Sequence, residues 1–167
     1  FESFIDSLMQ KDIRMIVLGD GESKYVDFFK KAVSGFPEKL FLYHGYSNEL
    51  AHLITAGADI FLMPSRYEPC GLNQMYSLIY GTIPVVRKTG GLADTVKDVE
   101  ENPETGNGYA FANFEPGEFY NKICKALEHF NDKDKWIGMQ SRGMNSDFSW
   151  GNSANKYIEL YNKMCLH

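Results

Sequence analysis

The sequence predicts an α/β fold, in which a parallel sheet is covered by helices on both faces. Short apolar runs alternate with longer segments of helical periodicity, the turns between them are short, and the apolar runs are almost unbroken. Strands that feed helices in strict alternation form parallel sheets, and strands buried on both faces are continuously apolar. At 167 residues the chain is one domain, long enough to bury a core without disulfides or metal.

Five short apolar runs are expected to be the strands of this sheet. They lie at residues 15–18, 40–43, 60–63, 83–86 and 108–111. Each of the first four ends in a turn that contains glycine, proline or serine and leads into a segment with helical periodicity. The last run is short and follows a polar loop at 99–108, so we expect it to be an edge-like strand.

The remaining segments are expected to be helices, at about 23–34, 72–80, 93–97, 116–130, 134–144 and 153–164. One more helix is expected to begin after Ser47, whose hydroxyl can cap it. Apolar stripes support two of them, formed by Val26, Phe29 and Val33 and by Leu50, Leu53 and Ile54. Residues 1–9 have the pattern of the last turns of an amphipathic helix. We therefore expect a preceding strand and its turn to lie before Phe1, in a longer protein.

Composition excludes several classes of partner. Lys and Arg number 17 against 22 Asp and Glu, a net charge of −5, which argues against nucleic acid and anionic membranes because both need a basic surface. No apolar run approaches the roughly 18 residues of a membrane span, and no signal peptide opens the chain. Cys70, Cys124 and Cys165 lack metal-ligand spacing, so we expect free thiols in a reducing cytosol and no metal.

Two glycine-bearing turns form the candidate site. Residues 64–72 (PSRYEPCGL) follow one predicted strand, and residues 87–92 (RKTGGL) follow the next. The carboxyl ends of neighbouring parallel strands are where α/β sheets bind phosphate and sugar. In the first turn, Pro69 and Gly71 set an unusual backbone path, and the helix that begins near Leu72 offers unpaired N–H groups to an anion.

Individual residues of these turns suggest chemistry. Glu68 stands just before the anion site, where a carboxylate can accept hydrogen bonds from sugar hydroxyls; a solvated loop glutamate is the alternative. Gly90 and Gly91 lack Cβ atoms and let the backbone approach a ligand closely, unless they form a plain turn. Arg87 and Lys88 are basic residues that could add charge to the site.

Two further residues are weighed in the same way. Cys70 would gain acidity at a helix N-terminus, but no histidine is near in sequence to act as a base, so burial in the core is favoured. Tyr46 lies in another strand-to-helix turn on the same rim, where an exposed tyrosine can stack on a base and a buried one would only pack. The turn at 19–21 (GDG) lacks the third glycine of a dinucleotide fingerprint and is interpreted as structural.

Taken together, the segment 46–96 resembles the donor side of bacterial glycogen synthases and plant starch synthases. The resemblance is carried by EPCGL at 68–72 and TGGLADTV at 89–96, and DFSW at 147–150 continues it. MYSL at 75–78 is similar to the bacterial branch. The resemblance implies the C-terminal half of a two-domain GT-B glycosyltransferase. Its fold would be a Rossmann-like parallel sheet with helices on both faces and the first strand missing.

The resemblance also implies a reaction, the transfer of glucose from ADP-glucose to the non-reducing end of an α-1,4-glucan with retention and with no metal or other cofactor. Glu68 would be the catalytic residue, binding the transferred glucose and supporting positive charge at its anomeric carbon. Tyr46 would stack on adenine. The other implied donor-binding residues are Cys70, Gly71, Leu72, Asn73, Thr89, Gly90 and Gly91.

By the same resemblance, residues 1–167 are a single nucleotide-sugar domain whose last helix, at about 152–165, crosses to an absent N-terminal acceptor domain. That domain, ADP-glucose and the glucan are the expected partners, in the bacterial cytoplasm or a plant plastid. The family's phosphate-binding Arg and Lys would lie before Phe1, so we expect this fragment alone to be inactive. Tyr76 stands where many related transferases have a ribose-binding glutamate. Alternatives are a domain of a UDP-sugar-dependent retaining transferase and a non-catalytic nucleotide-sugar-binding module.

Overall fold

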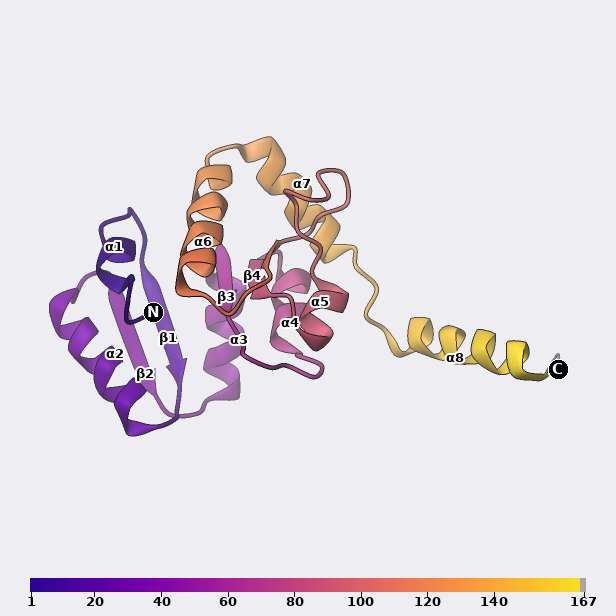
Figure 1. Ribbon diagram of the computed structural model, residues 1–167, viewed down its shortest axis with the longest axis horizontal. Helices are drawn as coiled ribbons and strands as arrows, with labels where there is room; N and C mark the ends of the chain where they lie inside the picture. The colour runs from indigo at the N-terminus through magenta and orange to yellow at the C-terminus, as the bar shows by residue number, and fades with distance from the viewer. Residues whose placement is uncertain (166–167) are drawn as a thin grey trace.

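A computed structural model describes residues 1–165. Strands and helices alternate as the sequence predicts until three helices end the chain (Figure 1). The strands are β1 (Met15–Gly19), β2 (Leu40–His44), β3 (Ile60–Met63), β4 (Ile83–Arg87) and β5 (Tyr109–Phe111). The helices are α1 (Ile5–Met9), α2 (Ser23–Gly35), α3 (Asn48–Gly57), α4 (Asn73–Tyr80), α5 (Gly90–Thr95), α6 (Pro116–Phe130), α7 (Lys133–Met144) and α8 (Trp150–Cys165).

All strand pairs are parallel, but the strands form two sheets. β1 pairs with β2, with Met15 opposite Leu40. β3, β4 and β5 form the second sheet in that order, with Ile60 opposite Ile83. In the described part of the chain β1 does not pair with β3, so the single continuous sheet suggested by the sequence is divided. The doubly wound strand order places the first strand between the second and the fourth. β1 and β3 hold these two positions, so the break falls where the sequence predicts a missing strand.

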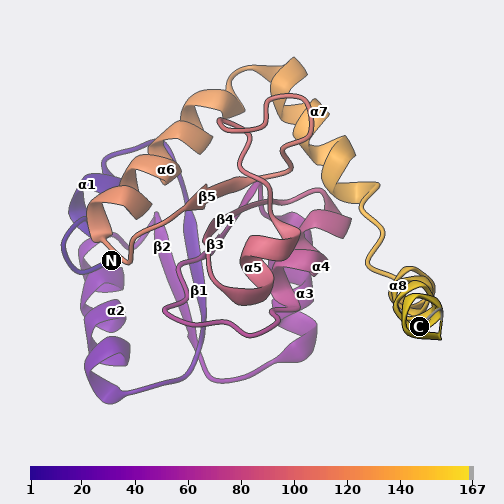
Figure 2. The same cartoon turned by 45° about the vertical axis from the view of Figure 1, so that its right-hand side comes forward.

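Helices cover both faces of the strands, as predicted. Along β4, Ile83 and Val85 belong to one apolar cluster and Val86 to another, because successive side chains point to opposite faces. Helices α1, α2, α6 and α7 contribute buried residues to the first cluster, and α4 and α5 to the second. Figure 2 shows α1, α2 and α6 on one side of the strands and α3, α4 and α5 on the other.

Local signals explain where several helices begin and end. The Ser47 hydroxyl accepts from the backbone N–H of Leu50 at 3.2 Å, which confirms the predicted cap of α3. Gly81 ends α4 with a φ of 79°, a conformation that favours glycine. α5 and α8 begin at Gly90 and Trp150, each about three residues before its predicted start.

One burial prediction, in α3, is wrong. Leu53 was expected in the apolar stripe of α3 but is 62% exposed, although α3 packs on α4. The expected edge-like strand is confirmed, since β5 ends its sheet. Tyr109 and Phe111 of this strand are buried, because α6 packs across β4 and β5.

α8 is the least integrated element. It stands apart from the rest of the ribbon in both views and contains no buried residue (Figures 1 and 2). Its exposed apolar side chains are Trp150, Tyr157, Ile158, Leu160, Tyr161 and Met164. Within residues 1–165, none of the helices combines the length and the apolar character needed to cross a membrane.

Candidate functional site

The two predicted turns touch each other through their backbones. The N–H of Gly91 donates to the carbonyl oxygens of Glu68 at 3.2 Å and Pro69 at 3.3 Å. A Cβ atom at Gly90 would lie 2.0 Å from the Glu68 oxygen, and one at Gly91 would lie 1.8 Å from the Cys70 oxygen. The sequence prediction explained these glycines by the approach of a ligand. In the structure they allow the turn after β4 to approach the turn after β3.

The first turn leads into a helix whose start is not capped by a side chain. Gly71 is buried with a φ of +71°, and Leu72 takes the N-cap position without a capping side-chain bond. Leu72 is 55% exposed and Asn73 is also exposed, so solvent reaches the start of α4. The first N–H groups of a helix lack intrahelical partners and favour negative charge. The start of α4 therefore has the character of an anion site.

Glu68 stands four residues before Leu72, in the turn that leads into this helix. Its residue is half-buried, and its carboxylate makes no hydrogen bond or ion pair to any residue between 1 and 165 that the structure describes. A carboxylate held by its backbone and free at its oxygens can accept hydrogen bonds from hydroxyl groups of a ligand.

Cys70 is exposed, so the prediction that it packs in the core is wrong. Its carbonyl oxygen lies 3.2 Å from the amide nitrogen of the buried Gln74, so the backbone of this turn is held while the residue stays exposed. Its sulfur lies 3.9 Å from the carbonyl oxygen of Gly71.

Two nearby cations, Arg87 and Lys88, are engaged by the protein. Arg87, at the end of β4, donates from Nε to the Ser65 carbonyl at 2.9 Å and from Nη2 to the Arg66 carbonyl. Lys88 forms an ion pair with Glu101 at 2.6 Å. These two side chains hold the first turn and the following loop in place.

Tyr46 is 85% exposed and lies in the turn between β2 and α3, in the other sheet. The structure leaves this ring free to stack and does not bring it into contact with the two turns. Tyr76 belongs to an aromatic group on α3 and α4, with its ring centroid 4.9 Å from that of His52. Nδ1 of His52 lies 3.0 Å from the hydroxyl of Tyr80.

Sequence reasoning missed Gln74, which is completely buried beneath the first turn. Its Nε2 donates to the Gly71 carbonyl at 2.8 Å and lies 3.1 Å from the hydroxyl of Thr95. The only signal for it was a polar residue at an inward position of α4, a weak one because amides are common in helices.

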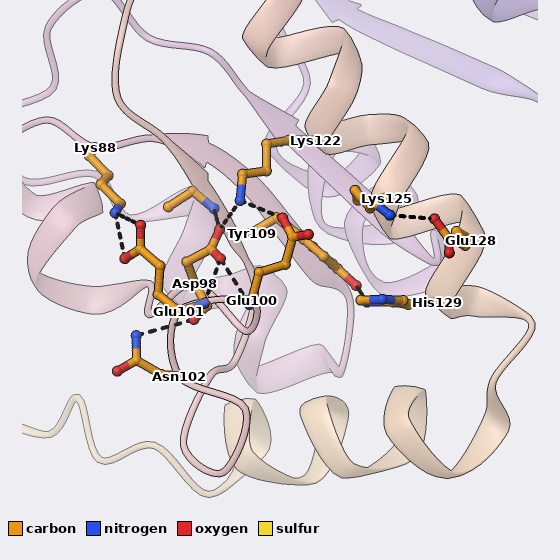
Figure 3. Close-up of polar contacts among 11 residues, drawn as sticks. Lys88, Asp98, Glu100, Glu101, Asn102, Tyr109, Lys122, Lys125, Glu128 and His129 are labelled. Carbon is orange, nitrogen blue, oxygen red and sulfur yellow. Dashed lines mark hydrogen bonds and ion pairs between the residues drawn. The ribbon is translucent and has the colours of Figure 1, made fainter.

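A buried ionic network holds the loop between α5 and β5 (Figure 3). The side chain of Asp98 is 0% exposed and accepts from the Ala110 N–H at 2.6 Å and from Lys122 Nζ at 2.8 Å. Lys122 also pairs with Glu100 at 2.6 Å. Burial lowers the pKa of Lys122, but its hydrogen bonds to Asp98 and Glu100 outweigh this effect and raise the pKa overall. The loop that follows the second turn is therefore anchored to β5 and α6.

Among residues 1–165, no group of three or more His, Cys, Asp or Glu side chains is arranged to hold a metal ion. The two turns thus combine three features. They are the uncapped start of α4, the carboxylate of Glu68, which has no partner among the described residues, and the backbone contact between Gly91 and Glu68.

The comparisons with known proteins agree with this arrangement. A family model described as glycosyl transferases group 1 matches residues 2–139. The chain belongs to this family of glycosyl transferases. The match includes both turns and every helix and strand from α1 to α6.

Individual relatives are more specific. The chain is 50% identical over 154 residues to a glycogen synthase of Fervidobacterium nodosum and 45% identical over 157 residues to one of Bacillus cereus. These alignments cover 91% and 94% of the chain but only 31% and 33% of those proteins. The chain thus spans about a third of the length of these relatives. The resemblance predicted from the two turns is confirmed.

A solved structure supports the fold in the same way. The catalytic domain of starch synthase IV from Arabidopsis thaliana, bound to ADP and acarbose, matches with a TM-score of 0.71 and 28% identity. The match covers 97% of this chain and 42% of that one.

Proposed function

We propose that this chain is the donor-binding domain of a glycogen synthase, which transfers glucose from ADP-glucose to the non-reducing end of an α-1,4-glucan with retention. The observation that carries the proposal is the backbone contact between Gly91 and Glu68. It joins the segments 68–72 and 89–96, the two motifs that resemble those of glycogen and starch synthases. Identity of 45% over nearly the whole chain to a glycogen synthase supports it.

The site residues take roles that their surroundings allow. The uncapped start of α4, with Gly71, Leu72 and Asn73, would bind the diphosphate, and Cys70 lies exposed beside it. Glu68 would accept hydrogen bonds from the glucose and stabilise positive charge that develops at its anomeric carbon. Thr89, Gly90 and Gly91 would line the same pocket.

Tyr46 would stack on adenine, since its ring is free and lies in a strand-to-helix turn. Aromatic stacking on a base tolerates the two-ring size of adenine and needs only an exposed face. The absence of a glutamate at Tyr76 leaves the ribose to other groups, and no metal or other cofactor is proposed.

The glucan acceptor would bind to a further domain of the same protein, with the active site between the two. We propose that α8 packs on that domain, as its apolar residues are all exposed here. In this proposal residues 1–167 form one domain whose last helix is the crossing segment, the protein works in the bacterial cytoplasm, and this chain alone lacks transferase activity.

The test is an NMR amide titration of this chain with ADP and, separately, UDP. We expect weak, ADP-selective binding with a dissociation constant on the order of millimolar, or about −4 kcal/mol. The shifted amides should be those of Tyr46, Gly71 to Asn73 and Thr89 to Gly91. Larger shifts with UDP would instead support a UDP-sugar-dependent transferase.

A non-catalytic binding module is the second alternative, and Glu68→Ala separates it from the proposal. In a protein extended to the full length of its relatives, this variant should lose glucosyl transfer. If the unmodified extended protein transfers no glucose to glycogen, the proposed activity is wrong and the binding module remains.

A further inference from the structure

The Gln74 side chain connects the two turns of the candidate site from below. Its amide nitrogen donates to the carbonyl oxygen of Gly71 at 2.8 Å and lies 3.2 Å from the carbonyl oxygen of Cys70, both in the turn after β3. The same nitrogen lies 3.1 Å from the Thr95 hydroxyl, at the end of α5. The Thr95 hydroxyl donates in turn to the Gly91 carbonyl at 2.6 Å.

The amide has two N–H groups for these three oxygens, so we assign them to the two shorter contacts, to Gly71 and Thr95, which gives a continuous chain of hydrogen bonds. The amide can only donate from nitrogen, so the Thr95 oxygen accepts from Gln74 and uses its own proton for Gly91. The chain thus links the carbonyl of Gly71 to that of Gly91 through two side chains.

The Gln74 amide is enclosed by the protein. Gln74 is 0% exposed, and a Cβ atom at Gly71 would lie 2.4 Å from its Oε1. That oxygen is buried and has no hydrogen-bond partner among the described residues. An unpaired buried acceptor is unfavourable. The fold keeps this side chain although only its nitrogen end is used, which indicates that the position of the nitrogen matters.

We propose that Gln74 and Thr95 are positioning residues that set the distance between the two turns, and with it the geometry of the donor pocket. The inference rests on the proposed function. Through Gly71 the pair orients the backbone just before α4. Through Gly91 it holds the second turn against Glu68. Neither side chain needs to touch the donor.

The experiment compares variants of this chain. Gln74→Met keeps the length of the side chain and removes its hydrogen bonds, and Thr95→Val removes the hydroxyl. Thr95→Ser keeps the hydroxyl and should restore the original behaviour. Thr82→Val is the matched control, because Thr82 is also buried and its hydroxyl donates to the backbone carbonyl of Thr55, with that of Ala58 also within 3.0 Å, away from the site.

The first readout needs no ligand. In Gln74→Met and Thr95→Val, hydrogen exchange of the Gly91 amide should accelerate roughly tenfold or more, as local opening of the second turn becomes easier. The double variant should show no further acceleration, since both side chains act in one chain of bonds. Thr82→Val should leave the exchange of this amide relative to global unfolding unchanged. Equal Gly91 exchange in all variants would overturn the inference.

The second readout is affinity for ADP by the same NMR titration. We expect Gln74→Met to weaken ADP binding roughly tenfold. Thr82→Val should lower thermal stability and leave ADP binding unchanged. Unchanged affinity in Gln74→Met would overturn the positioning role, even if exchange had changed. A wild-type chain that does not bind ADP would overturn the proposed function and with it the link to a donor pocket, whereas the exchange data would still decide whether the pair holds the turns together.

Discussion

The contact between the two turns depends on Gly90 and Gly91, because a Cβ atom at either position would collide with the backbone of the first turn. We expect Gly91→Ala to destabilise the chain by about 1–3 kcal/mol, because the added Cβ would start 1.8 Å from the Cys70 oxygen and the turns would have to separate. Gly117→Ala is the matched control in α6, where a Cβ would meet nothing within 4 Å. This control should stabilise by about 0.4–1 kcal/mol. Urea denaturation measures both, and equal effects would contradict the close approach.

Glu68 is expected to act in the transition state more than in binding. In the protein at the full length of its relatives, Glu68→Gln should lower the rate of glucosyl transfer roughly 10²-fold or more, because the developing positive charge loses its carboxylate. Binding of ADP should change little, because that charge is absent in the bound nucleotide. Glu104→Gln, in the exposed loop before β5, is the control that should leave both properties intact. A parallel loss of ADP affinity and rate would assign Glu68 to nucleotide binding instead.

At the scale of elements, the loop between α5 and β5 depends on the ion pair of Asp98 and Lys122. Removing one partner of a buried pair leaves an uncompensated charge and costs about 3–5 kcal/mol. We expect Lys122→Met to lie in this range at neutral pH, because the side chain of Asp98 is 0% exposed. Thermal or urea unfolding would measure it. A loss below about 1 kcal/mol would mean that the backbone donors alone satisfy Asp98.

The same pair predicts the alkaline behaviour. The pKa of Lys122 is raised above its ordinary value of 10.5, so the stability that it contributes is present below that value and is lost as the pH rises through the raised pKa. Burial raises the pKa of Tyr109 as well, so this residue also lowers the stability of the folded state as the pH rises. Unfolding free energy should therefore fall above about pH 10.5 in the wild type and less steeply in Lys122→Met. Identical slopes between pH 9 and 12 would contradict the assignment.

Elements were more predictable from the sequence than their contacts. The strand predicted at 83–86 and the helix at 116–130 are present nearly as expected, because unbroken apolar runs and helical stripes are local signals. The two turns were also predicted to lie at neighbouring strand ends. The contact of Gly91 with Glu68 and the burial of Gln74 could not be predicted, because they depend on how separate turns pack. Exposure of Cys70 escaped prediction for the same reason.

At the scale of the whole molecule, each sheet has an apolar strand with one unpaired edge: β1 in the first sheet and β3 in the second. In β3 all four residues, Ile60–Met63, are apolar yet only partly buried. Ile16 in β1 is 51% exposed. In β4, which has a strand on each side, Ile83 to Val86 are all buried. An open, apolar strand edge offers unpaired backbone groups and attracts other strands. The unpaired edges of β1 and β3 thus offer apolar strands to which a further strand could pair.

We predict that, in a protein extended before Phe1, an extended apolar segment pairs with β1 on one side and β3 on the other. The sheets would then merge into one with the order β2, β1, new strand, β3, β4, β5, which is the doubly wound order. The relatives are about three times as long as this chain, so they contain residues that could supply the segment. Hydrogen exchange of the Ile16 and Leu62 amides should slow at least tenfold in a protein extended before Phe1. The Val85 amide should change less, since β4 is already paired on both edges. Unchanged exchange at Ile16 and Leu62 in a folded, longer protein would mean that the two sheets remain separate and that the exposed strands serve another contact.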